Sequence, residues 1–154
     1  MAQGGFKLGF IGIIKCCFLS TVILMSFCSC DSMDNRISKD VIFALVTENE
    51  SLLLDDIKNN NFDASKGLDG INKIVTSEDI IEFSCGGAGF GPSTAYCGFY
   101  YTEDDNITAI WCAPESETDL VPYENGFLYE QENGDNRYYT EKICENFYYY
   151  EAAY

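Results

Sequence analysis

The chain has 154 residues, of which 25 are Asp or Glu, nine are Lys or Arg and none is His, so its formal charge is −16. This acidity argues against a nucleic-acid-binding protein, because contacts with phosphates need clustered Lys and Arg. Without histidine, Ser-His-Asp and Cys-His catalysis and histidine-ligated metal sites are excluded. A content of 47% hydrophobic and 15% aromatic residues excludes a disordered chain, and the length suits one domain with or without an appendage.

Residues 1–30 have the pattern of a segment that directs export. They contain Lys7 and Lys15 but no acidic residue, and residues 16–27 are apolar except for two serines and one threonine. A basic start, an apolar stretch and small residues at its end are typical of a secretory signal. By the positive-inside rule the lysines stay in the cytoplasm, so we expect the rest of the chain on the extracytoplasmic face of a membrane.

The last six residues of this segment, MSFCSC, resemble the lipobox of bacterial lipoproteins. In a lipobox a small residue precedes a cysteine that is lipidated and becomes the N-terminus after cleavage. Cys30 follows Ser29 and is the expected lipid acceptor, whereas Cys28 follows a bulky phenylalanine. An uncleaved signal anchor and a freely secreted product are the second and third interpretations. Residues 31–37 are the expected tether, and 38–154 the single extracytoplasmic domain.

Residues 38–61 have the spacing of an amphipathic helix. Ser38 is a candidate N-cap, Asp40 lies in the first turn, and a run of three asparagines at 59–61 marks the end. The apolar positions that favour one face are Val41, Ile42, Leu45, Val46, Leu52, Leu53 and Ile57. Such a helix must bury this face, and we expect it to cover the core of the domain.

After residue 70 the pattern changes to that of strands. Short runs rich in β-branched and aromatic residues are separated by turn clusters. These runs are residues 71–75, 80–83, 95–101, 107–113, 126–132 and 136–143, and residues 147–150 are a candidate for a last strand. The order predicts an α+β domain, in which an N-terminal amphipathic helix packs on an antiparallel β-meander of about five to six strands.

The Asn-Gly pair at 133–134 is the strongest short hairpin signal in the chain. A two-residue turn there pairs residues whose numbers sum to 267. Glu130 then faces Arg137 and Tyr129 faces Tyr138, so an opposite-charge pair and an aromatic pair arise together. A shift of one residue would lose both pairs, which favours this register.

A second turn, at residues 103–106, pairs residues whose numbers sum to 209. Cys97 then faces Cys112, and Trp111 covers Gly98 across the hairpin. This register predicts that residues 107–113 form a strand beside residues 95–101.

Four cysteines lie beyond residue 30, at Cys85, Cys97, Cys112 and Cys144. An even number in an exported domain suggests disulfides. The 209 register pairs Cys97 with Cys112 and leaves Cys85 for Cys144, and the alternative is that all four stay reduced as small apolar residues. They contain no Cys-x-x-Cys knuckle, so we expect no zinc site.

Other candidate chemistry has a plainer structural interpretation. Residues 85–91, CGGAGFG, lack the Lys-Ser/Thr of a phosphate-binding loop and predict a tight connection between strands. The acidic turns at 104–106 and 132–136 lack the spacing of a calcium-binding EF-hand and are interpreted as solvated turns. The many carboxylates could supply a hydrolytic pair, but the sequence singles out none. We expect no catalytic residue, no cofactor and no metal.

Aromatic residues are concentrated in the C-terminal part, where all eleven tyrosines lie at or after Tyr96. Neighbours on a strand point to opposite faces, so we expect tyrosines on both faces of the sheet. An exposed aromatic strip beside carboxylates would suit sugar rings or peptides, and the candidate binding residues are Trp111, Tyr138, Tyr148 and Tyr150. The plainer interpretation is a sheet surface whose hydroxyls reach water.

The strings CGGAGFGPSTAYCGFYYTEDD, AIWCAP and GDNRYYTEKICENFYYYEA resemble small uncharacterised lipoproteins of Gram-positive gut bacteria, over about residues 37–154. The resemblance implies an extracytoplasmic location and a domain of one helix and a sheet, and no activity. We therefore expect a membrane-anchored extracytoplasmic lipoprotein, a non-catalytic binding or structural module at the cell surface. Its expected partners are the membrane and a glycan or a protein, not nucleic acid. The alternative is a small histidine-free hydrolase that uses paired carboxylates.

Overall fold

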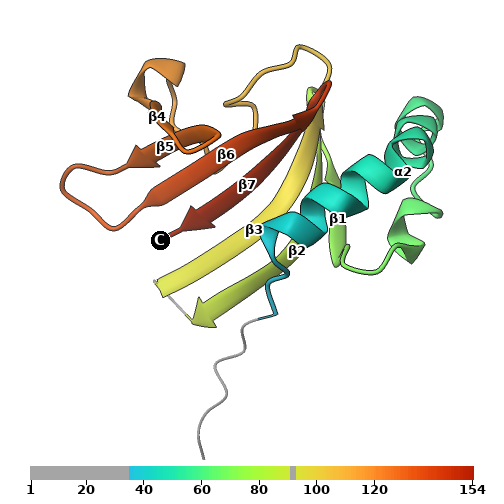
Figure 1. Ribbon diagram of the computed structural model, residues 1–154, viewed down its shortest axis with the longest axis horizontal. Helices are drawn as coiled ribbons and strands as arrows, with labels where there is room; N and C mark the ends of the chain where they lie inside the picture. Colours follow the sequence, from blue (N-terminus) through green and yellow to red (C-terminus); the bar gives the residue numbers. More distant parts are fainter. Residues whose placement is uncertain (1–34, 91–92) are drawn as a thin grey trace, which may run out of the picture. The chain divides into compact units, whose positions relative to one another are not determined.

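The computed structural model describes residues 35–90 and 93–154, so the expected signal segment and Cys30 lie outside the described residues. The described part consists of one α-helix and one sheet (Figure 1). The elements are α2 (Lys39–Asn59), the 3-10 turn η2 (Ser65–Gly67), β1 (Lys73–Thr76), β2 (Ile80–Phe90), β3 (Ser93–Thr102), the 3-10 turn η3 (Glu117–Asp119), β4 (Val121–Tyr123), β5 (Gly126–Glu130), β6 (Arg137–Cys144) and β7 (Phe147–Ala153).

The sheet has the strand order β1-β2-β3-β7-β6-β5-β4, and every neighbouring pair is antiparallel. The domain is therefore mostly β with one helix. The finer prediction was wrong in three respects. The sheet has seven strands instead of five to six, and α2 does not stand at the N-terminus of the chain. The path is not a simple meander either, because the chain passes from β3 to the far edge at β4 and returns until β7 lies beside β3.

Helix α2 covers one face of the sheet with a stripe of apolar side chains. Ile42, Val46 and Leu53 are all fully buried, at the helical spacing of four and seven residues. The helix bends where Asn49 leaves helical geometry, and it ends at Asn60, whose left-handed backbone is typical of a helix C-terminus. The stripe accounts for the contacts that α2 makes with β6 and β7.

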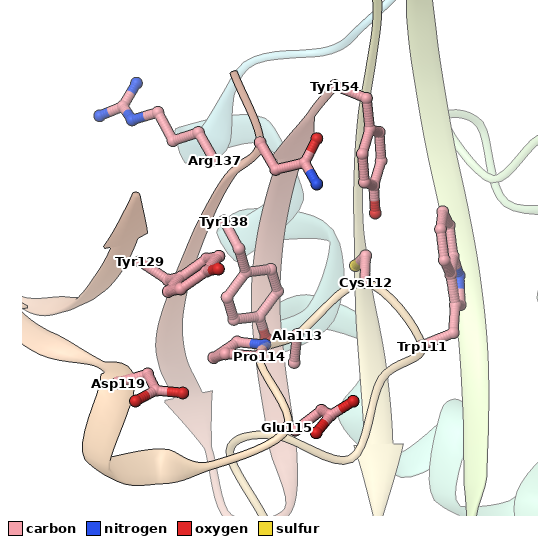
Figure 2. A pocket seen from close by; sticks show the side chains of 11 residues that line it. Trp111, Cys112, Ala113, Pro114, Glu115, Asp119, Tyr129, Arg137, Tyr138 and Tyr154 are labelled. Atoms are coloured by element: carbon pink, nitrogen blue, oxygen red, sulfur yellow. The ribbon is translucent and has the colours of Figure 1, made fainter. Parts of the chain in front are cut away.

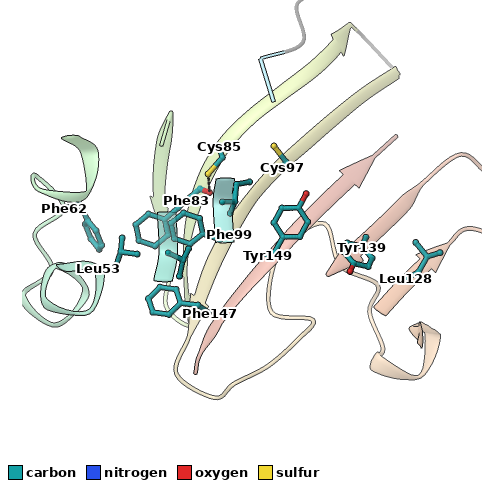
Figure 3. Close-up of a cluster of buried hydrophobic side chains, with 12 residues drawn as sticks. Leu53, Phe62, Phe83, Cys85, Cys97, Phe99, Leu128, Tyr139, Phe147 and Tyr149 are labelled. Carbon is teal, nitrogen blue, oxygen red and sulfur yellow. Dashed lines mark hydrogen bonds between the residues drawn. The ribbon is translucent and has the colours of Figure 1, made fainter. Parts of the chain in front are cut away.

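The side chains between α2 and the sheet form the helix-face cluster, which is rich in phenylalanine (Figure 3). Phe83 and Phe99 stack at 4.5 Å, and Phe147 packs against Phe99. The buried members of the cluster are Ile42, Val46, Leu53, Phe62, Phe83, Cys85, Cys97, Phe99, Leu128, Tyr139, Phe147 and Tyr149.

The opposite face of the sheet carries a second core, the loop-face cluster, in which tyrosines replace phenylalanines. Its buried members are Tyr100, Ile110, Leu120, Tyr138, Tyr148, Tyr150 and Ala152. The two faces alternate along β7, where Phe147 and Tyr149 belong to the helix-face cluster while Tyr148 and Tyr150 belong to the loop-face cluster.

The glycine-rich residues 85–90 form the second half of β2 and are paired with β3, so they are part of a strand and not a connection between strands. The glycines allow another segment to come close. A Cβ at Gly86 would lie 2.6 Å from the carbonyl oxygen of Asn35, and the Gly87 N–H donates to Asn35 Oδ1 at 2.8 Å. Residue 35, the first described residue, is thus held against β2.

The predicted hairpin around the turn at residues 133–134 is confirmed: Glu130 faces Arg137 and Tyr129 faces Tyr138 across β5 and β6. The predicted hairpin around the turn at residues 103–106 was wrong. Strand β7 occupies the edge of β3 with which residues 107–113 were expected to pair. Gly98 is covered by an aromatic ring, as that hairpin required, but the ring belongs to Tyr150.

Candidate functional site

The loop of residues 103–120 leaves β3, crosses the loop-face cluster and reaches β4 at the far edge. Two of its own side chains, Ile110 and Leu120, are buried in that cluster. Since residues 107–113 form no strand, their backbone lacks the regular pairing of a sheet. A segment that lies on a buried surface must satisfy its backbone polar groups in another way.

Hydroxyl groups of tyrosines on the sheet form hydrogen bonds with the backbone of the loop. The hydroxyls of Tyr100 and Tyr138 donate to the carbonyl oxygen of Ile107 at 2.7 and 3.2 Å. The hydroxyl of Tyr148 lies 2.9 Å from both the carbonyl oxygen and Oδ1 of Asp105. Burial raises the pKa of each of these three tyrosines, so they remain proton donors at neutral pH. We call these three residues the tyrosine clamp.

Asp105 fixes the start of the loop. Its carboxylate forms an ion pair with Lys142 and accepts from the backbone N–H of Asn146 at 3.2 Å. The hydrogen bonds from Lys142 and Tyr148 lower the pKa of the Asp105 carboxyl. Its backbone adopts a left-handed conformation, with φ of 54°, which Asp tolerates better than most residues.

Trp111 is the most exposed large hydrophobic side chain of the described residues, with 60% of its surface open to solvent. Its ring edge is nevertheless fixed. The indole Nε1 donates to Glu82 Oε2 at 3.1 Å, and the hydroxyl of Tyr150 donates to Glu82 Oε1 at 2.6 Å. Glu82 lies on β2 and is only 9% exposed. A buried carboxylate therefore holds the ring of Trp111 at the surface.

Two further aromatic rings surround Trp111. Tyr154 stacks on it with ring centroids 6.0 Å apart and an angle of 13° between the planes, and Tyr96 meets it edge-on at 6.1 Å. Tyr154 is positioned by paired backbone hydrogen bonds with Thr94 at 2.9 and 3.2 Å. Trp111, Tyr96 and Tyr154 form what we call the aromatic cluster. Their stacked and edge-to-face geometries are those that aromatic rings prefer.

Trp111 and Tyr154 of the aromatic cluster border a hollow of about 420 Å³ (Figure 2). Glu115 and Asp119 from the loop contribute carboxylates to its wall, while Asn136 and Arg137 contribute polar groups from the sheet side. The volume falls within the range of roughly 300–1,000 Å³ that is typical of small-molecule sites. The hollow thus combines exposed aromatic rings with a few hydrogen-bonding groups.

The structure brings together only part of the predicted binding set. Trp111 lies exposed at the hollow, and Tyr138 also lines the hollow, although its side chain is buried. Tyr148 and Tyr150 are buried, which corrects the expectation of a tyrosine strip, because the loop covers that face. Tyr96, Tyr154 and Glu82 were missed. For Glu82 a signal existed: an acidic residue inside an apolar strand needs a buried partner.

The predicted disulfide pairs are also corrected, since the four cysteines of the described residues form no disulfide. Cys97 belongs to the helix-face cluster, whereas Cys112 packs against the loop-face cluster on the other side of the sheet. Cys85 on β2 and Cys144 on β6 are separated by β3 and β7, about 14 Å at the usual strand spacing. A disulfide needs Cα atoms within about 7 Å.

The thiols are poorly suited to nucleophilic chemistry. Burial raises the pKa of Cys85 and Cys112 to about 12 and that of Cys144 to about 11. The nucleophile is the thiolate, which is scarce at neutral pH in such surroundings. The carboxylates that line the hollow, Glu115 and Asp119, are exposed, whereas the general acid of a glycosidase is typically shielded from water.

Two further properties concern metals and membranes. Among the residues described, no three Cys, Asp or Glu side chains gather closely enough to hold a metal ion. Within the same part of the chain, no helix has the length and apolarity needed to cross a membrane. No family model matches the chain, and neither a curated protein nor a solved structure matches it.

Proposed function

We propose that the chain is a membrane-anchored extracytoplasmic lipoprotein that acts as a binding module, with the aromatic cluster as its binding surface. The single observation that carries the binding role is the exposure of Trp111 in a fixed orientation. The exposed ring of Trp111 lies beside the exposed ring of Tyr96, and contiguous exposed apolar surface marks interaction sites. The anchor is argued from the sequence of residues 1–30 alone.

The anchor is tested with matched cysteine variants of the full chain, expressed in a bacterium that processes lipoproteins. We expect the wild type and Cys28→Ala to fractionate with membranes and to begin at an acylated Cys30, as measured by intact mass. Cys30→Ala should lose the acyl group. Recovery of the wild type from the cytosol, starting at Met1 and without acylation, would refute the anchor.

The binding role is tested on whole cells by photo-crosslinking. A photoreactive phenylalanine analogue placed at Tyr154 keeps Trp111 intact and should capture a ligand of any chemical class. The same analogue at Phe127, an exposed aromatic residue outside the hollow, is the matched control. Adducts at position 154 but not at 127 support the proposal, and equal labelling or none at both contradicts it.

A further inference from the structure

The hollow has the chemistry of a saccharide site, and we propose that it binds a neutral oligosaccharide built of hexoses. This inference rests on the proposed function, since it names the ligand of the same surface. A pyranose ring has a flat apolar face of C–H groups and hydroxyls that radiate in its plane. A site for it needs an exposed aromatic platform and hydrogen-bonding groups around the rim.

Trp111 provides the platform. Tyr154 stacks on its ring with centroids 6.0 Å apart, and 60% of the surface of Trp111 stays accessible to a ligand. Because the indole N–H is already bonded to Glu82, stacking on the ring leaves no polar group unsatisfied. The ring is also held in place before binding, which reduces the entropy that a ligand must overcome.

The rim provides the acceptors and donors. Figure 2 shows Trp111 and Tyr154 on one side of the hollow and Asp119 on the other. Glu115 and Asp119 are exposed carboxylates that can accept hydrogen bonds from sugar hydroxyls. Arg137 can donate, although it already pairs with Glu130 at 3.4 Å. The hollow therefore combines an aromatic surface for stacking with hydrogen-bonding groups at its rim.

The charge of the protein argues against anionic sugars as ligands of the hollow. The chain carries a formal charge of −16, and two of its carboxylates line the hollow. A polyanionic glycan would be repelled by this field. A basic peptide would be attracted by the carboxylates and can place a Lys or Arg side chain over the indole ring, so it is the competing ligand in the experiment.

Glu82 is a positioning residue in this arrangement. It does not line the hollow, and it acts by holding the indole of Trp111 and the hydroxyl of Tyr150. Glu82→Gln keeps one acceptor oxygen, whereas Glu82→Leu removes both. We expect Leu to weaken sugar binding more than Gln, together with a change in the emission of Trp111 that marks a reoriented ring.

The experiment uses the only tryptophan of the chain as its own probe. The full chain, purified in a detergent without a sugar headgroup, is titrated with cellohexaose and mannohexaose, and with polygalacturonate and a lysine-rich peptide as charged comparisons. We expect saturable quenching or a shift of Trp111 emission with at least one neutral hexaose. Polygalacturonate should give none.

Calorimetry on variants assigns the binding to the hollow. Trp111→Ala should weaken binding by about tenfold or more, as the loss of a central aromatic contact usually does. Phe127→Ala should leave the affinity for the sugar unchanged. Equal thermal unfolding of the two variants is the folding control. No binding of any neutral hexaose, sugar binding that survives Trp111→Ala, or binding of the peptide alone would overturn the inference. If one of these results occurred while the photo-crosslinking at position 154 still captured a ligand in cells, the binding role would keep its support. Only the assignment of that ligand as a sugar would be refuted.

Discussion

One face of the sheet is covered by helix α2 and the other by the loop of residues 103–120, and the side chains beneath them differ accordingly. Under the helix lie the stacked rings of Phe83 and Phe99 with Phe147 beside them. A helix satisfies its own backbone hydrogen bonds, so the sheet beneath it needs to offer only apolar surface.

Under the loop lie Tyr100, Tyr138 and Tyr148, whose hydroxyls reach the loop's carbonyl oxygens. A loop brings unsatisfied backbone groups to a buried surface, and leaving one unpaired costs about 1–3 kcal/mol. Tyrosine therefore combines the apolar area of phenylalanine with the donor that the loop needs. The comparison explains why Tyr100, Tyr138 and Tyr148 lie under irregular chain. Two tyrosines of the helix-face cluster, Tyr139 and Tyr149, donate instead to Glu141 and Glu151.

The largest loss is expected from emptying the helix-face cluster. Phe99 is fully buried between Phe83 and Phe147, so Phe99→Ala should lower the free energy of unfolding by about 3–5 kcal/mol. Urea denaturation followed by circular dichroism measures this loss. Phe99→Leu fills most of the space and should cost less. Equal losses in both variants would show that the stacked rings are not tightly packed.

A smaller loss, confined to one face, is expected from the tyrosine clamp. Tyr148→Phe keeps the ring and removes the donor to Asp105, so stability should fall by about 1–3 kcal/mol. Tyr123→Phe, at an exposed site, is the matched control and should cost less than about 0.5 kcal/mol.

Amide hydrogen exchange separates the two faces in these variants. Tyr148→Phe should accelerate exchange in residues 103–120 while α2 stays protected, because the loop can open without the helix. Phe99→Ala should lower protection in both faces by a similar amount. If Tyr148→Phe accelerated exchange in α2 and the loop alike, the two faces would form one cooperative unit.

Elements with strong local signals could be predicted from the sequence. The hairpin of β5 and β6 was correct because an Asn-Gly turn, the pair of Glu130 with Arg137 and the pair of Tyr129 with Tyr138 all favour one register. The helix at residues 39–59 lies within the range that its apolar spacing indicates. Local chemistry and packing agree in both cases.

Features that depend on long-range pairing could not be predicted. Residues 107–113 have the composition of a strand, but β7 occupies the edge of β3 where they would have paired. β4 was missed because it has three residues and contains Pro122. The aromatic cluster joins Tyr96 from β3, Trp111 from the loop and Tyr154 from the end of the chain, so no local spacing indicates it.

Acid should weaken the contacts that hold the start of the loop of residues 103–120. The hydrogen bonds from Lys142 and Tyr148 place the pKa of Asp105 below its ordinary 3.8, so its contribution is complete above that pH. It is lost as the pH falls through the lowered pKa of the folded state. Asp105→Asn should therefore be less stable than the wild type at neutral pH, and the difference should narrow below pH 3.8. Asp104→Asn, at the exposed neighbouring site, should show no such convergence.

The smallest effect is expected where neither face is involved. Arg137 and Glu130 lie opposite each other with side chains 48% and 66% exposed, so their ion pair should contribute only about 0.2–1 kcal/mol. A double-mutant cycle of Arg137→Gln and Glu130→Gln measures the coupling, and added salt should reduce it further. A coupling above about 2 kcal/mol would mean that the pair, and not the packing of the two faces, fixes the register of β5 and β6. In that event each single variant would shift the strands that border the hollow, which Arg137 lines, in addition to removing a charge. A small coupling would show that turn chemistry and the buried aromatic residues on both faces suffice to align these strands.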